Sequence, residues 1–408
     1  MDVIIWEWLE LGFRWLHVIA GIAWIGTSFY FMHLDASLKS SQNLPSEAGG
    51  ETWQVHSGGF YHMVKFVVAP SQMPENLTWF KWEAYTTFLS GLVLLVIIYY
   101  LGAELYLIDN NVFELSADVA ITLSASSIVI AWFVYNLLCK SKLGQFEWAL
   151  GIIGFALIAA SMWGFTQIFS ARGAFMQMGA IIGSIMIVNV WRIVIPNQKL
   201  VVEDLIAGRS PDPRLGAEAK LRSTHNNYLT LPVLFIMISN HYPLAYASEW
   251  NWVIFVIILI VGGIIRHYFN LKHGSEKNAW WCWVIALIGI TVAAWLSSIS
   301  PADSEKTVSA KVETTKVSLD SQVMDIVSTR CSMCHASKPL WEGLVAAPKG
   351  IVLDTEERGK AEAKQIYISS YLSNAMPPSN VSYMENSERK LIALWFASIE
   401  STKQASLK

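Results

Sequence analysis

Five consecutive residues near the C-terminus carry the clearest chemistry in this sequence: Cys331, Ser332, Met333, Cys334 and His335. Two thiols at this spacing can form thioethers with the two vinyl groups of a haem, and the adjoining histidine then lies beneath the iron as its proximal ligand. A bare CxxCH motif could also belong to a zinc site or a redox site. The surrounding sequence therefore has to supply the rest of a haem domain.

The flanking sequence has the features of a small all-α class I cytochrome c domain. Residues 318–330 and 387–399 both show the apolar spacing of amphipathic helices. Met376 precedes Pro377 and Pro378, whose rings would stiffen a loop that presents the methionine sulfur as sixth ligand. A thioether opposite an imidazole raises the potential of haem iron, which suits an electron acceptor. The alternative role for Met376 is that of an ordinary core methionine.

The composition of the rest of the chain is typical of a membrane protein. Apolar residues make up 53% of the 408 residues and charged residues only 15%, which argues against an all-soluble enzyme. A net charge of -3 gives no basic footprint for nucleic acid, and four cysteines are too few for a disulfide scaffold. Eight stretches have the roughly 20 mostly apolar residues that a membrane helix needs. They lie near residues 11–33, 81–101, 118–139, 147–169, 173–195, 226–243, 252–272 and 279–299.

The sequence thus predicts an all-α fold in three parts: a polytopic membrane bundle of about eight helices (1–300), a linker (301–316) and the cytochrome c domain (317–408). The sixth stretch contains Pro232 and is predicted as a kinked span, with a re-entrant segment as the alternative.

Basic residues predict the orientation of the spans. Alternate loops hold 14 Lys and Arg residues, whereas the loops between them contribute only Arg172 and the N-terminal segment only Arg14. Both termini are therefore expected on the outer, periplasmic side of a bacterial inner membrane. Thioether attachment of haem in bacteria happens on that same side, so the motif and the charges agree.

Histidines in the spans are candidates for binding noncovalent haem. His17 and His241 are expected at an outer level and His33 and His225 at an inner level, as ligands of one or two b-type haems, with His267 a competing inner ligand. Sixteen residues separate the histidines within each span, which is about 4.4 turns, so they face different sides of a straight helix. A histidine near a span end is also often an interfacial hydrogen-bonding group. Both interpretations stay open.

Two inner loops are predicted to hold a substrate. Residues 53–65 and 222–228 mix glycine, aromatic, amide and cationic side chains, which suits a flat anionic heterocycle. His62 or His225 could act as the base, because an imidazole titrates near 6.5. Lys65 could hold the anion, and Asn226 offers an amide to the ring edge. Each of these residues taken alone is equally well explained as part of a solvated loop.

Longer stretches of the sequence resemble a known family. RWLHVIAGIAWIGTSFYFMHLD, WQVHSGGFYHMVKF, THNNYLTLPVLFIMISNH, CSMCH, APKGIVLDT and NAMPPSN are similar to the bacterial membrane-bound urate oxidases of the PuuD type, and the similarity covers essentially the whole chain. The resemblance implies oxidation of urate to 5-hydroxyisourate in purine degradation, with electrons passing to the respiratory chain rather than directly to dioxygen. It also implies haem attachment at Cys331, Cys334 and His335, with Met376 as the distal candidate. It transfers no catalytic residues.

Two other functions stay open on the residues alone. The chain could be a non-catalytic electron-transfer subunit that relays electrons to its haem c, or a quinol oxidoreductase. In each case the partners are the lipid bilayer and a soluble or membrane cytochrome or terminal oxidase as electron acceptor. Whether the chain forms a homo-oligomer also stays open.

Overall fold

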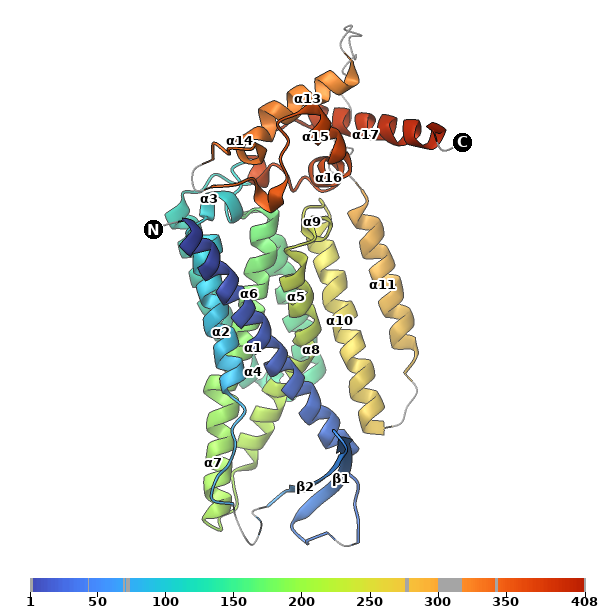
Figure 1. Cartoon of the computed structure of the whole chain (residues 1–408). Coiled ribbons are helices and arrows are strands. Elements are labelled where there is room, and N and C mark those ends of the chain that lie inside the picture. The colour runs from blue at the N-terminus through green and yellow to red at the C-terminus, as the bar shows by residue number, and fades with distance from the viewer. Residues whose placement is uncertain are drawn as a thin grey trace.

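The structure, a computed structural model, describes residues 3–42, 44–68, 70, 74–275, 279–299, 318–341 and 344–406. Long helices run up and down a bundle, and a smaller helical unit formed by the C-terminal residues caps one end (Figure 1). We call this end the capped end and the opposite end the hairpin end. The predicted linker 301–316 lies outside the described residues.

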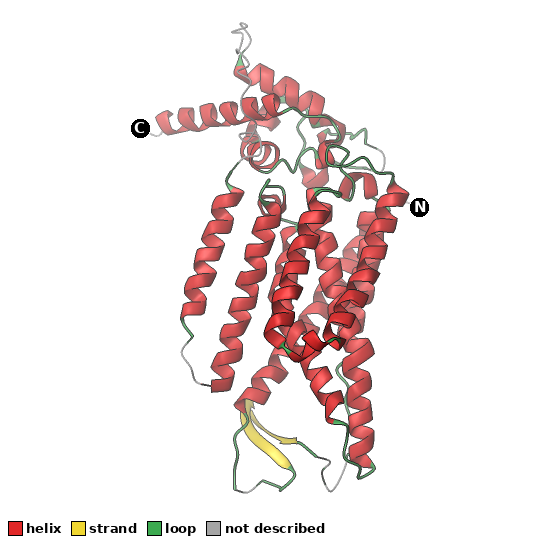
Figure 2. Cartoon of the chain, turned by 180° about the vertical axis from the view of Figure 1, so that it is seen from behind, coloured by secondary structure: helices red, strands yellow, loops and turns green. Residues whose placement is uncertain are grey.

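The bundle helices follow one another in alternating directions (Figures 1 and 2). They are α1 (Val3–Ser37), α2 (Trp82–Leu94) with η1 (Leu95–Tyr100), α4 (Ala117–Lys140), α5 (Glu147–Thr166), α6 (Ala171–Asn189) with η3 (Val190–Val194) and α7 (Ile195–Ile206), α8 (Pro213–Ser239), α10 (Asn251–Ser275) and α11 (Trp281–Ser297). The short elements are α3 (Ala103–Tyr106) and α9 (Pro243–Tyr246) at the capped end, and η2 (Lys142–Gln145).

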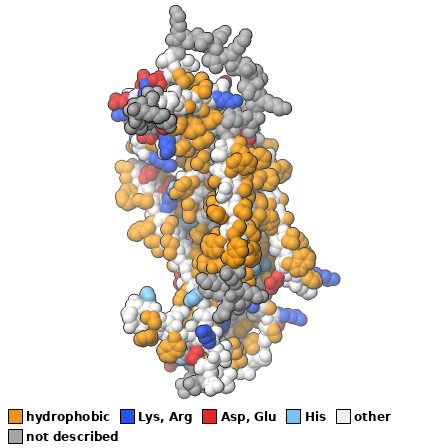
Figure 3. All heavy atoms as spheres, turned by 90° about the vertical axis from the view of Figure 1, so that its right-hand side faces the viewer, with side chains coloured by type: hydrophobic (Ala, Val, Ile, Leu, Met, Phe, Trp, Pro, Cys, Tyr) orange, Lys and Arg blue, Asp and Glu red, His pale blue; other side chains and the backbone are white. Residues whose placement is uncertain are grey.

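Every predicted span coincides with a helix. Within the described residues, six helices are long and apolar enough to cross a membrane, and α11 is apolar but only 17 residues long. α8 is long but begins with the polar segment 213–228. The apolar helices are compatible with membrane insertion, and hydrophobic side chains cover much of the bundle flank (Figure 3). The total of eight crossings stays a prediction.

The sixth predicted span lies almost entirely within one continuous helix, α8. α8 continues as a helix through Pro232. The ring of Pro232 lies against Gly262 of α10, where a Cβ atom would come within 2.6 Å of the proline Cδ. The glycine lets the two helices approach closely at the point where the proline has removed a backbone donor.

A two-stranded hairpin departs from the predicted all-α class. β1 (Ala48–His56) pairs antiparallel with β2 (Gly59–Phe66), and Trp53 lies opposite His62. Ser57 and Gly58 both have positive φ, as a two-residue hairpin turn requires. Aromatic and β-branched residues on either side of a Ser-Gly turn favour strands, a local signal that the spacing of the apolar spans does not contain.

The C-terminal residues form a compact helical unit. Its elements are α13 (Leu319–Arg330), α14 (Ser332–His335), η4 (Pro348–Gly350), α15 (Glu356–Ala361), α16 (Ala363–Tyr367), η5 (Ile368–Leu372), η6 (Pro378–Asn380) and α17 (Asn386–Ser406). α13 packs against α17, and both coincide with the predicted amphipathic segments. Trp395 is fully buried and donates a hydrogen bond to Asp320 Oδ1 at 2.8 Å, which links the two helices.

This unit contacts the capped end of the bundle through η6 against α3 and through η5 against α9. Ser379 Oγ donates to the carbonyl oxygen of Leu105 at 3.2 Å, and Ala375 packs on the buried apolar core of the bundle. The contact places the segment around Met376 directly on the capped end.

Candidate functional site

The first half of α8 carries polar side chains into the interior of the bundle. Arg222, His225 and Asn226 are three or four residues apart, so they share one helix face, and they meet Tyr135 of α4 and Asn189 of α6. We call these five residues the α8 polar cluster. Because α8 starts at the hairpin end, the cluster lies in the half of the bundle away from the C-terminal unit (Figure 1).

Direct hydrogen bonds join most of the cluster. Tyr135 Oη lies 2.8 Å from His225 Nδ1. Asn189 Nδ2 donates to Tyr135 Oη and to Asn226 Oδ1, both at 3.1 Å. Asn226 Nδ2 in turn donates to the carbonyl oxygen of Met186 at 2.8 Å. Tyr135 Oη has two lone pairs, so it can accept from both Asn189 Nδ2 and His225 Nδ1, a tautomer that leaves Nε2 of the histidine unprotonated.

Arg222 is the exception in this network. Its side chain is 0% exposed, and its guanidinium carbon lies 4.9 Å from the ring centre of Tyr135. Nη2 donates to Asn136 Oδ1 at 2.8 Å and lies 3.7 Å from a carboxylate oxygen of Glu218. Within the described part of the chain, Nε and Nη1 of Arg222 and Oδ1 of Asn189 are buried without a hydrogen-bond partner. Buried unpaired polar atoms are rare in folded proteins and need an explanation.

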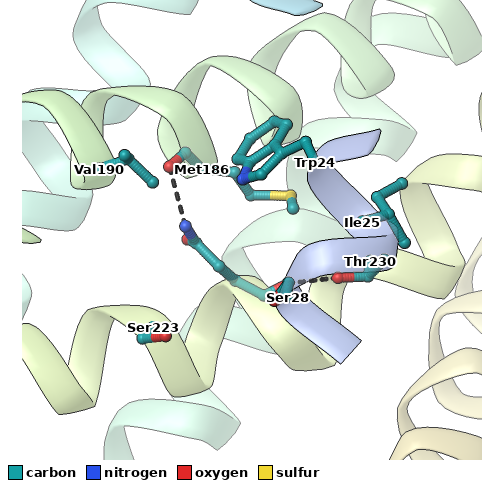
Figure 4. Close-up of a pocket in the computed structure, with 8 residues that line it drawn as sticks. Trp24, Ile25, Ser28, Met186, Val190, Ser223 and Thr230 are labelled. Atoms are coloured by element: carbon teal, nitrogen blue, oxygen red, sulfur yellow. Dashed lines mark hydrogen bonds between the residues drawn. The ribbon is translucent and has the colours of Figure 1, made fainter. Parts of the chain in front are cut away.

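A cavity of about 60 Å³ opens beside the cluster (Figure 4). This is roughly four times the space that one buried water needs. Three stretches of chain line it: Trp24, Ile25 and Ser28 from α1, Met186 and Val190 from α6 and η3, and Ser223, Asn226 and Thr230 from α8. The cavity and the cluster share Asn226, so the polar site has room next to it for a bound group.

The opposite face of α8 forms a second polar network against α10. Arg266 is 6% exposed, and its Nε donates to Asn227 Oδ1 at 2.5 Å. Asn227 Nδ2 donates to Asn270 Oδ1 at 3.1 Å, and the Arg266 guanidinium carbon lies 4.0 Å from the ring centre of Phe29. These contacts bind α8 to α10 and α1, so the network has an evident structural role.

The CxxCH segment in the C-terminal unit has the arrangement that a haem ligand needs. His335 Nδ1 donates to the carbonyl oxygen of Ile351 at 2.8 Å, which leaves Nε2 for a metal. Burial raises the pKa of the Cys331 thiol to about 12, and burial also raises the pKa of Cys334. In the described residues, no three His, Cys, Asp or Glu side chains gather as a metal site. The thiols of Cys331 and Cys334 and the Nε2 of His335 are the donors that a covalently attached haem needs, and its attachment stays a prediction.

Met376 is held from both sides of its peptide unit. Its backbone N–H donates to the carbonyl oxygen of Ser369 at 2.8 Å, and its own carbonyl oxygen accepts from Arg389 Nη1 at 2.8 Å. Arg389 is 3% exposed and also donates to the Ser370 carbonyl oxygen and to Asn380 Oδ1. The loop that would present a sixth ligand is thus fixed by one buried cation.

Comparison with known proteins identifies the larger part of the chain. Residues 3–297, well over half of the sequence, match the model of the urate oxidase N-terminal family. The chain belongs to this family. No curated protein and no solved structure matches it. The matched range contains the hairpin, the α8 polar cluster and the cavity, and it ends before the CxxCH segment.

In this member of the urate oxidase N-terminal family, the four predicted catalytic residues fall into two groups. His225 and Asn226 lie in the α8 polar cluster. His62 and Lys65 lie on β2, where His62 Nε2 is 2.5 Å from Glu51 Oε2 and its ring stacks on Trp53 at 4.2 Å. The Lys65 ammonium pairs with Asp35 at 2.7 Å. His62 and Lys65 contact residues of the hairpin itself and Asp35 of α1, so the two groups occupy different parts of the molecule.

The predicted noncovalent haem ligands each have a place in the bundle. His17 Nδ1 lies 2.9 Å from the Thr87 carbonyl oxygen, and its ring covers Gly91, where a Cβ atom would come within 2.9 Å of it. His267 Nδ1 lies 2.9 Å from Tyr228 Oη. His33 lies near the hairpin end of α1, and His241 follows α8 at the capped end. Hydrogen bonds account for His17, His225 and His267, and haem ligation by any of these histidines stays a prediction.

Sequence reasoning passed over Tyr135 and Asn189, and it placed Arg222 in the predicted substrate segment 222–228 without giving it a role of its own. Tyr135 and Asn189 are polar residues inside two of the most apolar predicted spans, which is itself a signal of function in membrane proteins. Arg222 lies in the 222–228 segment, but only the packing shows that its guanidinium is buried rather than at a membrane surface.

Proposed function

We propose that this protein oxidises urate to 5-hydroxyisourate at the α8 polar cluster and delivers the electrons to a haem c in its C-terminal unit. Family membership supports urate as the substrate. The site assignment rests on one observation: Arg222 and Asn189 are buried with unpaired polar atoms beside the half-buried His225 and Asn226, inside the matched range.

The reaction balances as urate monoanion plus water giving 5-hydroxyisourate, one proton and two electrons. His225 is placed to take the proton, because Tyr135 occupies its Nδ1 and its Nε2 remains for substrate or water. Asn226 presents an amide both to the cluster and to the cavity. The ring of Tyr135 offers an aromatic neighbour to a flat heterocycle.

The C-terminal unit supplies the ligands for the haem. Cys331 and Cys334 would hold the porphyrin, and His335 and Met376 would bind the iron. When bound, such a haem is a one-electron acceptor of raised potential, through which the chain would reduce a soluble or membrane cytochrome or a terminal oxidase. The hydrogen bond from His335 Nδ1 to Ile351 fixes the imidazole for this role.

The proposal places the bundle in the bacterial inner membrane with the C-terminal unit in the periplasm. The basic loops support this orientation, and the N-terminus and the C-terminal unit lie at the same end of the bundle (Figure 1). The cluster lies toward the other end, so an electron relay is needed between them. One or two b-type haems on bundle histidines would supply it, and His17 fits because its Nδ1 can donate to Thr87 and leave Nε2 for iron.

The test is to add urate anaerobically to the purified protein and follow the haem c α-band together with the loss of urate absorbance. Reduction by urate alone, in step with its consumption, supports the enzyme. Reduction only by a quinol or by a partner dehydrogenase would support the quinol oxidoreductase or the electron-transfer subunit instead. Acid-acetone extraction from the same sample tests for noncovalent haem, because haem c remains with the protein.

A further inference from the structure

We propose that Arg222 and Asn189 form the recognition site for a planar heterocyclic monoanion, with Arg222 as the group that binds the negative charge. The inference rests on the proposed function and specifies how the substrate would be recognised. It starts from three buried atoms without partners in the described structure: Nε and Nη1 of Arg222 and Oδ1 of Asn189.

Comparison with the other buried arginines shows that Arg222 is unusual. Arg389 donates to two backbone carbonyls and an amide oxygen. Arg266 donates to two amide oxygens and lies on an aromatic ring. Arg222 is the most deeply buried of the three. Its Nη2 donates to Asn136 Oδ1 and its guanidinium lies on the Tyr135 ring, but Nε and Nη1 have no acceptor in the described structure. Its nearest carboxylate, Glu218, lies at 3.7 Å and is 32% exposed. An incompletely paired cation at this depth is costly unless a ligand completes it.

The mixture of unpaired atoms specifies the ligand class. The two guanidinium N–H groups require acceptors, as carbonyl oxygens or a deprotonated ring nitrogen would be. Asn189 Oδ1 requires a donor, because the amide N–H groups of this residue already point to Tyr135 and Asn226. A simple oxyanion such as sulfate would bring only acceptors and would be repelled by that oxygen. A urate monoanion carries both carbonyl oxygens and ring N–H groups on one edge, so it matches both needs.

Nearby groups extend the same pattern. Trp132 lies one turn before Tyr135 on α4, and its Nε1 is a further buried donor without a partner in the described structure. The cavity reaches Asn226, which is hydrogen-bonded to Asn189. The site thus has donors and an acceptor where α4, α6 and α8 meet, and the cavity between α1, α6 and α8 adjoins it at Asn226.

Two variants separate ligand recognition from fold. Asn136→Asp keeps the shape of the side chain but gives Arg222 a carboxylate partner at the position where Asn136 Oδ1 now accepts at 2.8 Å. We expect this variant to retain its thermal stability while its affinity for urate falls by about 10- to 100-fold, because the new anion competes with the substrate. Arg222→Lys keeps a positive charge but loses the planar donor pattern, and we expect a loss of at least 10-fold.

The measurements use the full chain in nanodiscs. KM and kcat for urate are determined with an artificial electron acceptor, and direct binding is measured with 8-azaxanthine as a non-oxidised planar anion. Neutral hypoxanthine and sulfate serve as ligand controls, and neither should bind comparably. Arg192→Met removes an exposed cation from η3 near the same end of the bundle and should leave KM unchanged. Size-exclusion elution and thermal unfolding report whether each variant is folded.

The outcomes distinguish the two proposals. If wild type oxidises urate and both folded variants keep the wild-type KM and azaxanthine affinity, Arg222 has no recognition role and this inference is overturned, whereas the proposed function stands. If sulfate binds as tightly as 8-azaxanthine, the site is a general anion site and the assigned ligand class is wrong. If wild type neither binds nor oxidises urate, both proposals fail together.

Discussion

Replacing Arg389 by methionine tests whether one buried cation holds the Met376 loop. The side chain is 3% exposed and donates to the carbonyl oxygens of Ser370 and Met376 and to Asn380 Oδ1. Burial lowers its pKa to about 10, so the guanidinium stays charged at neutral pH. Methionine fills similar space but makes none of these bonds.

The size of the effect follows from the acceptors left behind. Each buried polar group left without a partner costs roughly 1–3 kcal/mol, so two carbonyls and an amide would cost about 3–5 kcal/mol after relaxation. A small domain has a total stability of only about 5–15 kcal/mol. We therefore expect Arg389→Met to bring the C-terminal unit close to unfolding while the bundle remains folded. If haem c is present, its methionine ligation should weaken as well.

The assay is limited proteolysis of the full chain with detection of a C-terminal tag, which reports on this unit whether or not it carries haem. Arg358→Met is the matched control, because this arginine is 53% exposed and pairs only at the surface with Asp354. The reasoning is refuted if Arg389→Met digests no faster than the Arg358 variant. The haem absorption band that depends on a methionine–iron bond gives a second readout.

Two further predictions concern titratable groups. His225→Gln should lower kcat for urate by about 10²–10⁴-fold, as expected for loss of a general base. His62→Gln on the hairpin should lower kcat by less than 10-fold. If the His62 variant instead lost more activity than the His225 variant, the site would lie at the hairpin. The hydrogen bond from Lys360 lowers the pKa of Asp320. The charged carboxylate therefore stabilises the folded C-terminal unit at pH values above the ordinary pKa of Asp, and this stabilisation is lost as the pH falls through the lowered pKa. Asp320→Asn should therefore make the C-terminal unit less stable at neutral pH and reduce the further loss of its stability in acid. Proteolysis rate measured against pH tests this prediction. An unchanged acid profile would show that Asp320 is not the group responsible.

The positions of the bundle helices could be predicted from the sequence because their signal is simple. A run of about 20 apolar residues has few alternatives to a membrane helix, and all eight predicted stretches are helical. The amphipathic segments around Leu319 and Ile392 also appear as α13 and α17. The hairpin was missed because its signal is local turn chemistry at Ser57 and Gly58 rather than periodicity over a span.

The candidate site could be predicted only in part, because it depends on which helix faces meet. His225 and Asn226 stood out as polar residues near a span end. Their partners Tyr135 and Asn189 come from helices 36 or more residues away in the sequence, and spacing along one helix does not show which neighbour a side chain faces. Likewise, the sequence does not show that Arg222 is buried rather than at the surface. An arginine in either position fits the excess of basic residues in that loop.

The contact between the two parts of the molecule constrains how they can work together. The segment that touches the capped end, around Ala375 and Ser379, is the same loop that carries Met376. Arg389 anchors this loop from within the C-terminal unit, while Leu105 of α3 anchors it from the bundle. If the C-terminal unit only diffused near the membrane on its linker, the loop that carries the predicted iron ligand Met376 would not need to contact the bundle. Placing that loop against the bundle shortens the path from the matched region to the proposed electron acceptor, and the hydrogen bond from Ser379 to Leu105 joins α3 to the loop three residues from Met376.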